Sequence, residues 1–179
     1  MPTKKNSPES QNLESKKEKM YDTKNDINKN LRVKLNVLLN QRLADVIDLQ
    51  LQLKQAHWNV KGPNFISLHE LFDRVSEGIE IYSDNIAERI VQLGGIAEGT
   101  IGVISKRSKL DEYPLDIGDG SDHVKATVGA LAKFASMIRQ SITEASDLKD
   151  DDTADIFTEV SRGIDKWLWF VEAHRQANH

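Results

Sequence analysis

Apolar residues recur every three or four positions in four long segments of the chain, and polar residues fill the positions between them. Gly62-Pro63 and Gly94-Gly95 interrupt this pattern and are expected to end the first two segments. Asp150-Asp151-Asp152-Thr153 supplies an N-cap and favourable negative charge at the start of the fourth. The spacing therefore predicts four amphipathic helices, over about residues 31–60, 64–93, 121–147 and 153–176.

The connection between the second and third predicted helices, residues 95–120, is too long for a simple turn between neighbouring helices. Such a connection can run the length of a bundle, as in ferritin-like topologies. Residues 96–109 can add a short helix within it. We therefore predict an all-α, ferritin-like four-helix bundle over residues 31–176, followed by a short C-terminal end at residues 177–179.

The charge of the chain is divided unevenly along its length. The formal net charge is −4, yet residues 1–30 carry +2, from seven lysines and five acids, and contain few apolar residues. Because such a segment cannot bury enough apolar surface to become ordered, we predict a flexible Lys-rich tail on an acidic body. The tail is either a solvated solubility segment or a weak arm for nucleic acid or a protein partner.

The chain contains no cysteine, which excludes disulfides, thiolate metal sites and a cysteine nucleophile. Any bound metal must therefore be held by His, Asp or Glu. No apolar run is long enough to span a membrane, and the sequence after Met1 is polar rather than a signal peptide. We expect a soluble, cytoplasmic protein.

The second predicted helix carries an acidic band. At 100° per residue, one imidazole and six carboxylates fall within about 100°, with no Lys or Arg of that helix among them. Like charges four residues apart repel by about 0.2–0.5 kcal/mol per pair. The band is either a solvated face or a cation-binding surface, and the missing counter-charge makes the two comparably good explanations. Its members are His69, Glu70, Asp73, Glu77, Glu80, Asp84 and Glu88.

The spacing within the band suggests a second copy of the chain. Asp73 and Asp84 are about 16 Å apart along one helix and cannot share an ion. Both 69/88 and 73/84 are centred on position 78.5, so an antiparallel pair of helices would bring His69 to Glu88 and Asp73 to Asp84 of the other copy. We predict a metal site between two chains, with Gly78 where the two helices approach most closely.

His57 lies on the apolar stripe of the first predicted helix and is either a hydrogen-bonded core histidine or a further ligand. Mixed imidazole and carboxylate ligands suit Fe(II), Mn(II) or Zn(II). The Glu-x-x-His signature of di-iron sites inside one bundle is absent from the sequence, which independently favours a site between chains.

Several motifs follow one another at consistent spacing. They include Lys54-Gln55-Ala56-His57-Trp58-Asn59-Val60-Lys61-Gly62, Leu68-His69-Glu70, Asp84-Asn85-Ile86-Ala87-Glu88-Arg89, Gln92-Leu93-Gly94-Gly95, Tyr113-Pro114-Leu115-Asp116-Ile117 and Lys166-Trp167-Leu168-Trp169-Phe170. Together, over about residues 35–172, they resemble the Dps family, the DNA-binding proteins from starved cells, or mini-ferritins. The resemblance implies a hollow dodecameric shell that oxidises Fe(II) between twofold-related subunits, stores ferric mineral and so protects DNA from oxidative damage.

The resemblance also implies roles for individual residues, and hydrogen peroxide as the usual oxidant. The implied ferroxidase ligands are His57, His69 and Asp73 of one subunit with Asp84 and Glu88 of its neighbour. Trp58 corresponds to a tryptophan beside that site, its other reading being a core aromatic. Glu70, Glu77 and Glu80 are candidates for iron transfer or nucleation. The candidates for threefold iron-uptake pores, a role compatible with helix capping, are Asp150, Asp151, Asp152 and Asp155.

Family members that bind DNA often use Lys-rich tails, and the acids interspersed in this tail predict weak, sequence-independent and salt-sensitive binding. The tail lysines are Lys4, Lys5, Lys16, Lys17, Lys19, Lys24 and Lys29. Two alternative functions are a nucleoid-associated structural protein acting through its tail and a non-redox zinc-buffering cage, since Zn(II) also accepts His and carboxylate ligands. His123, His174 and His179 match no motif and are expected at the surface or the C-terminal end.

Overall fold

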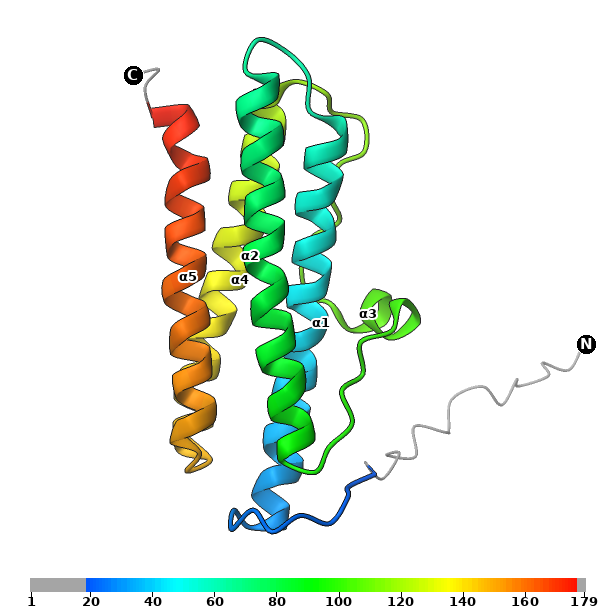
Figure 1. The fold of residues 1–179 in the computed structure, drawn as a ribbon, viewed down its shortest axis with the longest axis vertical. Helices are drawn as coiled ribbons and strands as arrows, with labels where there is room; N and C mark the ends of the chain where they lie inside the picture. The colour runs from blue at the N-terminus through cyan, green and yellow to red at the C-terminus, as the bar shows by residue number, and fades with distance from the viewer. Residues whose placement is uncertain (1–18, 177–179) are drawn as a thin grey trace, which may run out of the picture.

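The computed structural model describes residues 19–176, and this part of the chain is helical with loop connections (Figure 1). No helix within the described residues is both long and apolar enough to cross a membrane. The four long helices and the short crossover helix were predicted from the sequence, and the all-α four-helix fold is confirmed. The helices are α1 (Lys29–Asn59), α2 (Phe65–Gln92), α3 (Ile101–Arg107), α4 (Gly120–Asp147) and α5 (Asp151–Gln176).

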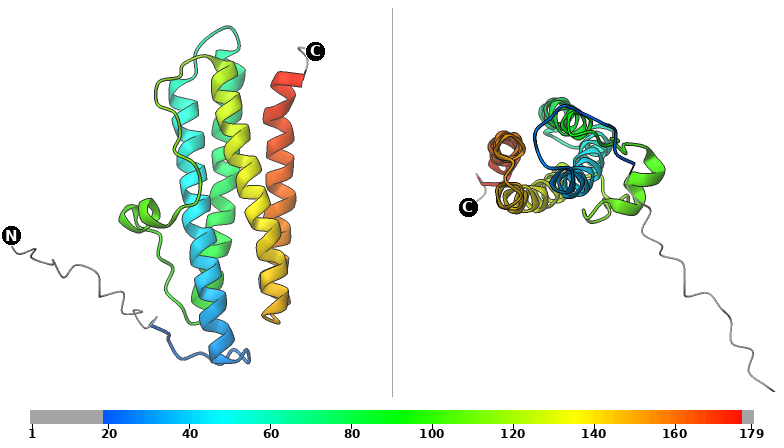
Figure 2. Two further views of the ribbon diagram at one scale, coloured as in Figure 1. Left: turned by 180° about the vertical axis from the view of Figure 1, so that it is seen from behind. Right: turned by 90° about the horizontal axis from the view of Figure 1, so that it is seen from below.

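Two helical hairpins build the bundle: α1 packs along α2, and α4 packs along α5 (Figures 1 and 2). The hairpins join mainly through α1 and α4, whereas α2 meets α5 less extensively. One apolar core between them contains residues from the predicted stripes of all four long helices. Its largest fully buried side chains include Phe72, Phe134, Phe157, Leu35, Leu39, Leu43, Ile79 and Ile86.

The helix ends coincide with the predicted caps and breaks. Gly62 has φ of +106° and Gly94 has φ of +83°, left-handed conformations that favour glycine. The Asp150 carboxylate accepts a hydrogen bond from the Thr153 backbone N–H, with an N–O distance of 3.2 Å, at the start of α5. The predicted capping of this helix is therefore confirmed.

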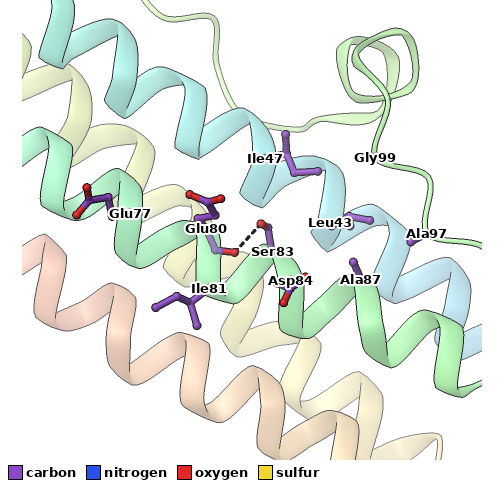
Figure 3. A pocket seen from close by; sticks show the side chains of 10 residues that line it. All are labelled: Leu43, Ile47, Glu77, Glu80, Ile81, Ser83, Asp84, Ala87, Ala97 and Gly99. Carbon is purple, nitrogen blue, oxygen red and sulfur yellow. Dashed lines mark hydrogen bonds between the residues drawn. The ribbon is translucent and has the colours of Figure 1, made fainter.

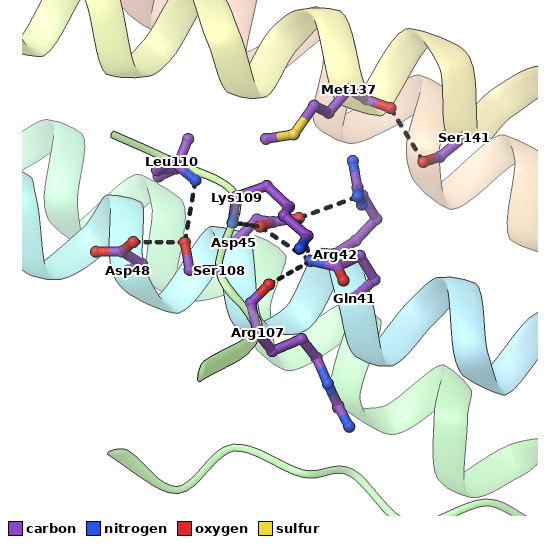
Figure 4. Close-up of polar contacts among 10 residues, drawn as sticks. All are labelled: Gln41, Arg42, Asp45, Asp48, Arg107, Ser108, Lys109, Leu110, Met137 and Ser141. Atoms are coloured by element: carbon purple, nitrogen blue, oxygen red, sulfur yellow. Dashed lines mark hydrogen bonds and ion pairs between the residues drawn. The ribbon is translucent and has the colours of Figure 1, made fainter. Parts of the chain in front are cut away.

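The crossover is held against α1 by a row of polar α1 side chains that bind its backbone (Figure 4). Amides donate to carbonyl oxygens, and amide or carboxylate oxygens accept from backbone N–H groups, at 2.7 to 3.0 Å. The apolar stripe of the first helix gave no indication of this second, polar face. The pairs are Asn40 with Ile96 and Glu98, Gln41 with Arg107, Asp45 with Lys109, and Gln52 with Asp111.

Asp45 is the most deeply placed member of this row, with 0 % of its surface exposed. Burial raises its pKa above 3.8, while the hydrogen bond from the Lys109 N–H and the charge of Arg42, 3.2 Å away, oppose that rise. The ion pair and the backbone hydrogen bond together satisfy a carboxylate that would otherwise be costly to bury.

The described part of the predicted tail, residues 19–28, lies against the bundle. The Tyr21 N–H donates to the Gly94 carbonyl at 2.7 Å, and a Cβ at Gly94 would lie 2.6 Å from the backbone carbonyl oxygen of Tyr21. Arg32 of α1 reaches the same turn and donates to the Leu93 carbonyl at 2.9 Å. Helix α1 itself begins at Lys29, so the ordered body extends further back than the predicted boundary at residue 31.

Candidate metal centre

His57 at the end of α1 and His69 near the start of α2 bind each other's backbone. The Nδ1 atom of each ring lies 2.8 Å from the carbonyl oxygen of the other residue. The two rings stack with centroids 3.7 Å apart and planes at 22°. Because a carbonyl oxygen can only accept, both Nδ1 atoms carry the proton, and both Nε2 atoms keep the lone pair that a metal ion would bind.

The short turn between α1 and α2 makes this arrangement possible. Gly62, with its positive φ, reverses the chain, so that residues twelve apart in sequence meet across the turn. Phe65, the first residue of α2, packs against the His69 ring with a centroid distance of 5.1 Å. The side chain of His57 is 12 % exposed. The two imidazoles are therefore held in fixed orientations close to the surface.

Asp73, one turn beyond His69 on α2, is bound by a cation from α1. Lys54 Nζ lies 2.5 Å from Asp73 Oδ1, and His57 Nδ1 lies 4.0 Å from the same oxygen. The hydrogen bond from Lys54 lowers the pKa of Asp73 below 3.8; desolvation opposes this shift, and the nearby imidazole of His57 reinforces it. No Lys or Arg of α2 lies within the acidic band, but the neighbouring helix supplies a cation to Asp73.

Asp84 and Glu88, one turn apart near the other end of α2, are both exposed. Within residues 19–176, no hydrogen bond or ion pair joins either carboxylate to another residue. Asp84 borders an open groove of about 620 Å³ together with Glu77 and Glu80 (Figure 3). The groove's other wall comes from α1 and the crossover and includes Leu43, Ile47 and Ala97.

One chain alone does not assemble a full ligand set. Among residues 19–176, no group of three or more His, Asp or Glu side chains is close enough to hold an ion. His57, His69 and Asp73 gather at the beginning of α2, whereas Asp84 and Glu88 stand near its end. The pairing of these two sets between chains stays a prediction.

Two other predicted residues of this region lie on the surface. Trp58 is 65 % exposed, with Lys54 Nζ 5.9 Å from its ring centroid, so it is not a core aromatic of the single chain. Glu70 is also exposed.

The predicted place of Gly78 is wrong. Gly78 lies about 140° around the helix from Asp73 and therefore away from the acidic band. It faces α5, where a Cβ would lie 2.7 Å from the Trp167 indole. The same spacing of 100° per residue that defined the band could have predicted this position. A residue at the band's midpoint in sequence need not lie on the band's face of the helix.

Asp150 is buried rather than available to a pore. It is 2 % exposed, and Arg89 Nη2 lies 2.7 Å from its Oδ1 atom. Its second oxygen accepts a hydrogen bond from the Thr153 hydroxyl at 2.5 Å. The predicted pore role therefore does not fit Asp150. The other three pore candidates, Asp151, Asp152 and Asp155, are exposed at the start of α5.

The expectation that His123 lies at the surface is also wrong. His123 is 1 % exposed, and its Nδ1 atom lies 2.7 Å from the Tyr113 hydroxyl of the crossover. Burial lowers the pKa of His123 below 6.5 and raises that of Tyr113. On a helical wheel centred on the buried Val124, His123 lies about 100° away, beyond the apolar stripe, so the spacing along this helix does not indicate its burial. His174 is exposed, as expected, and His179 lies outside the described residues.

The tail lysines within the described range are exposed. Lys19, Lys24 and Lys29 face solvent, with Lys19 Nζ 5.0 Å from the Tyr21 ring centroid. Lys4, Lys5, Lys16 and Lys17 lie outside the described residues.

The chain is similar to known proteins in sequence and in fold. A ferritin-like domain matches residues 36–177. The DNA protection during starvation protein of Agrobacterium fabrum is 48 % identical over 158 residues, covering 88 % of this chain and 98 % of the relative. The structure of Mycobacterium smegmatis Dps in its tetragonal form aligns with a TM-score of 0.82 and 34 % identity, covering 86 % of this chain and 94 % of that one. Dps from Microbacterium arborescens in the high iron form aligns with a TM-score of 0.75 and 30 % identity, covering 80 % and 93 % of the two chains.

Proposed function

Because this chain belongs to the Dps family of ferritin-like proteins, we propose that it is a ferroxidase that stores iron. It oxidises Fe(II) with hydrogen peroxide at sites between two copies of the chain and deposits the ferric product inside a dodecameric shell. The observation that carries this proposal is the His57–His69 pair, whose protonated Nδ1 atoms bind backbone and whose Nε2 atoms are left for metal.

The partial ligand set at the start of α2 supports a site completed by a neighbour. Two imidazoles and Asp73 provide nitrogen and oxygen donors of the kind that Fe(II) accepts. Asp84 and Glu88 of a twofold-related copy would add two carboxylates, and both are exposed and unpaired within residues 19–176. Lys54 pairs with Oδ1 of Asp73, so Lys54 and iron would compete for the negative charge of this carboxylate.

The proposed reaction joins two one-electron oxidations to one two-electron reduction. Two Fe(II) ions each lose one electron, and hydrogen peroxide takes up both electrons and two protons to form two water molecules. Carboxylates stabilise the higher charge of Fe(III) more than that of Fe(II), which favours oxidation at the site. Consuming peroxide together with Fe(II) removes both reagents that form hydroxyl radicals.

The names of the relatives agree with this function. The Agrobacterium fabrum relative is a DNA protection during starvation protein, and the Microbacterium arborescens structure is a high iron form. We propose that this chain protects DNA chiefly by removing iron and peroxide. Within the shell, Glu70, Glu77 and Glu80 would transfer or nucleate iron, since all three are exposed carboxylates on the acidic band.

Asp151, Asp152 and Asp155 are the remaining candidates for a negatively charged uptake pore. A cluster of carboxylates at a narrow opening raises the local cation concentration. Replacing all three by Asn is expected to slow iron uptake while leaving the helix cap at Asp150 intact. Unchanged uptake by the assembled variant would contradict the pore role.

DNA binding through the Lys-rich tail is a separate proposal. We expect weak retardation of DNA that disappears as salt is raised, because the contacts would be to phosphate. Removing residues 1–18, which carry four of the seven tail lysines, should sharply reduce the retardation and leave Fe(II) oxidation unchanged. Retardation that is undiminished by this truncation would place DNA binding elsewhere on the protein.

The central test measures Fe(II) oxidation by purified, assembled protein with peroxide and, separately, with oxygen. We expect peroxide to be the faster oxidant. The double variant His57→Ala/His69→Ala should lose nearly all of the rate, and His174→Ala, which changes an exposed histidine outside the site, should lose none. An unchanged rate in the double variant would overturn the site.

A further inference from the structure

At the middle of α2, an interlocking contact joins this helix to α5. Gly78 and Tyr82 lie four residues apart on α2, and Gly163 and Trp167 lie four residues apart on α5. A Cβ at Gly78 would lie 2.7 Å from the Trp167 indole nitrogen, and a Cβ at Gly163 would lie 1.8 Å from the Tyr82 hydroxyl oxygen. Each aromatic ring therefore occupies the space left by the glycine of the opposite helix. We call these four residues the glycine–aromatic lock.

The lock needs glycine at both positions. Glycine inside a helix costs about 1 kcal/mol relative to alanine, so two helix-interior glycines are unfavourable unless they allow a close approach. At both positions the first atoms that an added Cβ would meet belong to a partly buried aromatic side chain, the Trp167 indole at Gly78 and the Tyr82 hydroxyl group at Gly163. Gly129, inside α4, differs because no atom lies within 4 Å of a Cβ placed there.

Neighbouring side chains of α5 pack against Trp167. Trp167 meets Phe170 edge to face, with centroids 5.7 Å apart and planes at 89°. Lys166 Nζ lies 5.7 Å from the centroid of the Trp167 ring and 5.7 Å from that of the Phe170 ring. Burial raises the pKa of Tyr82, and the charge of Glu159 adds to this rise.

The lock contacts the side of α2 that lies away from the acidic band. Taking Asp73 as zero, Gly78 lies at about 140° and Tyr82 at about 180° around the helix. Along the axis, the lock lies between Asp73 and Asp84, at the level where the two partial ligand sets of the proposed site are separated. Helix α2 packs mainly on α1 and meets α5 less extensively, and the lock lies within this smaller contact with α5.

We propose that the glycine–aromatic lock is a positioning element for the proposed metal site. It sets the rotation and height of α2, so that His69 and Asp73 at one end and Asp84 and Glu88 at the other face a neighbouring chain together. The proposal rests on the proposed function. It adds four residues, none of them a ligand, that control metal binding from behind the helix.

The test measures anaerobic Co(II) binding to the assembled protein by calorimetry, with assembly checked by light scattering. Gly163→Ala and Gly78→Ala should each weaken Co(II) binding about tenfold, the lower end of what loss of a ligand-orienting group costs. Gly129→Ala is the matched control, since it adds the same methyl group to an open position, and it should leave Co(II) affinity unchanged.

Compensating variants separate positioning from general stability. Tyr82→Leu removes the ring that an added methyl group at residue 163 would meet, so Gly163→Ala/Tyr82→Leu should recover much of the Co(II) affinity lost in Gly163→Ala. If Gly163→Ala does not assemble, Tyr82→Leu alone carries the test, because it empties the contact without a clash and should still weaken Co(II) binding.

The outcomes are distinguishable. Wild-type protein that binds no Co(II) would overturn the proposed function itself. Wild-type binding together with unchanged affinity in the assembled lock variants, even with a lower melting temperature, would overturn only the positioning role.

Discussion

At the beginning of α2, His69 and Asp73 are already engaged by α1: the imidazole by the His57 backbone and the carboxylate by Lys54. Near the end of the same helix, Asp84 and Glu88 stand exposed and unpaired within residues 19–176. The first set is oriented within one chain, whereas the second is left without a partner there. A ligand set divided in this way suits a site that is complete only when two copies meet.

Mixing two inactive variants is the strongest test of whether each site takes one ligand set from each of two chains. Asp84→Asn/Glu88→Gln should lose Fe(II) oxidation by about hundredfold or more, as His57→Ala/His69→Ala does. If each site takes one set from each chain, reassembling equal amounts of the two variants restores one intact site in every mixed pair. The rate should then return to about a quarter of the wild-type rate, for random pairing.

The control for this mixing experiment is each variant carried alone through the same dissociation and reassembly, which should stay inactive. No recovery in protein that light scattering finds fully mixed would mean that both sets act within one chain.

The exposed end of α2 is expected to be firmly anchored through Arg89, next to Glu88. Arg89→Met leaves the Asp150 carboxylate buried and unpaired, so it should lower the free energy of unfolding by about 3–5 kcal/mol. Denaturant unfolding measures this change. Arg139→Met removes an exposed ion pair to Asp165, both partners about half exposed, and should cost about 0–1 kcal/mol. Similar costs for the two variants would mean that the buried pair does not anchor this end.

The ion pair between Lys54 and Asp73 is expected to lower the affinity of the ligand set at the beginning of α2 for a metal ion. Lys54→Met leaves Asp73 without its cation, so a metal no longer competes with one for the charge of this carboxylate. A pair of this exposure contributes ~1 kcal/mol, so the affinity for Co(II) should rise about fivefold. Lys125→Met, which changes an exposed lysine of α4, is the control. Weaker binding in Lys54→Met would mean that Lys54 holds Asp73 in place for the metal.

The smallest expected effect is the dependence of stability on pH in the metal-free protein. The pKa of Asp73 is lowered from 3.8 by Lys54, so its ion pair stabilises the fold fully above that value and is lost as pH falls through the lowered pKa. The stability difference between wild type and Lys54→Met should be present at pH 7 and shrink below pH 3.8. A difference that persists in strong acid would come from the packing of the Lys54 side chain.

The helices, the long crossover and the members of the acidic band could be predicted because each depends on spacing along one helix. Contacts between helices could not be predicted in this way. Lys54 reaches Asp73 from α1, Arg89 takes Asp150 into the interior, and Trp167 occupies the space at Gly78. His123 was assigned to the surface because it matches no motif, although its burial depends on Tyr113, ten residues earlier in the chain.

The polar row on α1 recognises the crossover almost entirely through main-chain atoms. Such recognition depends on the path of the crossover rather than on which side chains it carries. Natural variation or engineering could therefore change the outward-facing residues of this segment freely, whereas inserting or deleting a single residue would put its carbonyls and amides out of step with Asn40, Gln41, Asp45 and Gln52.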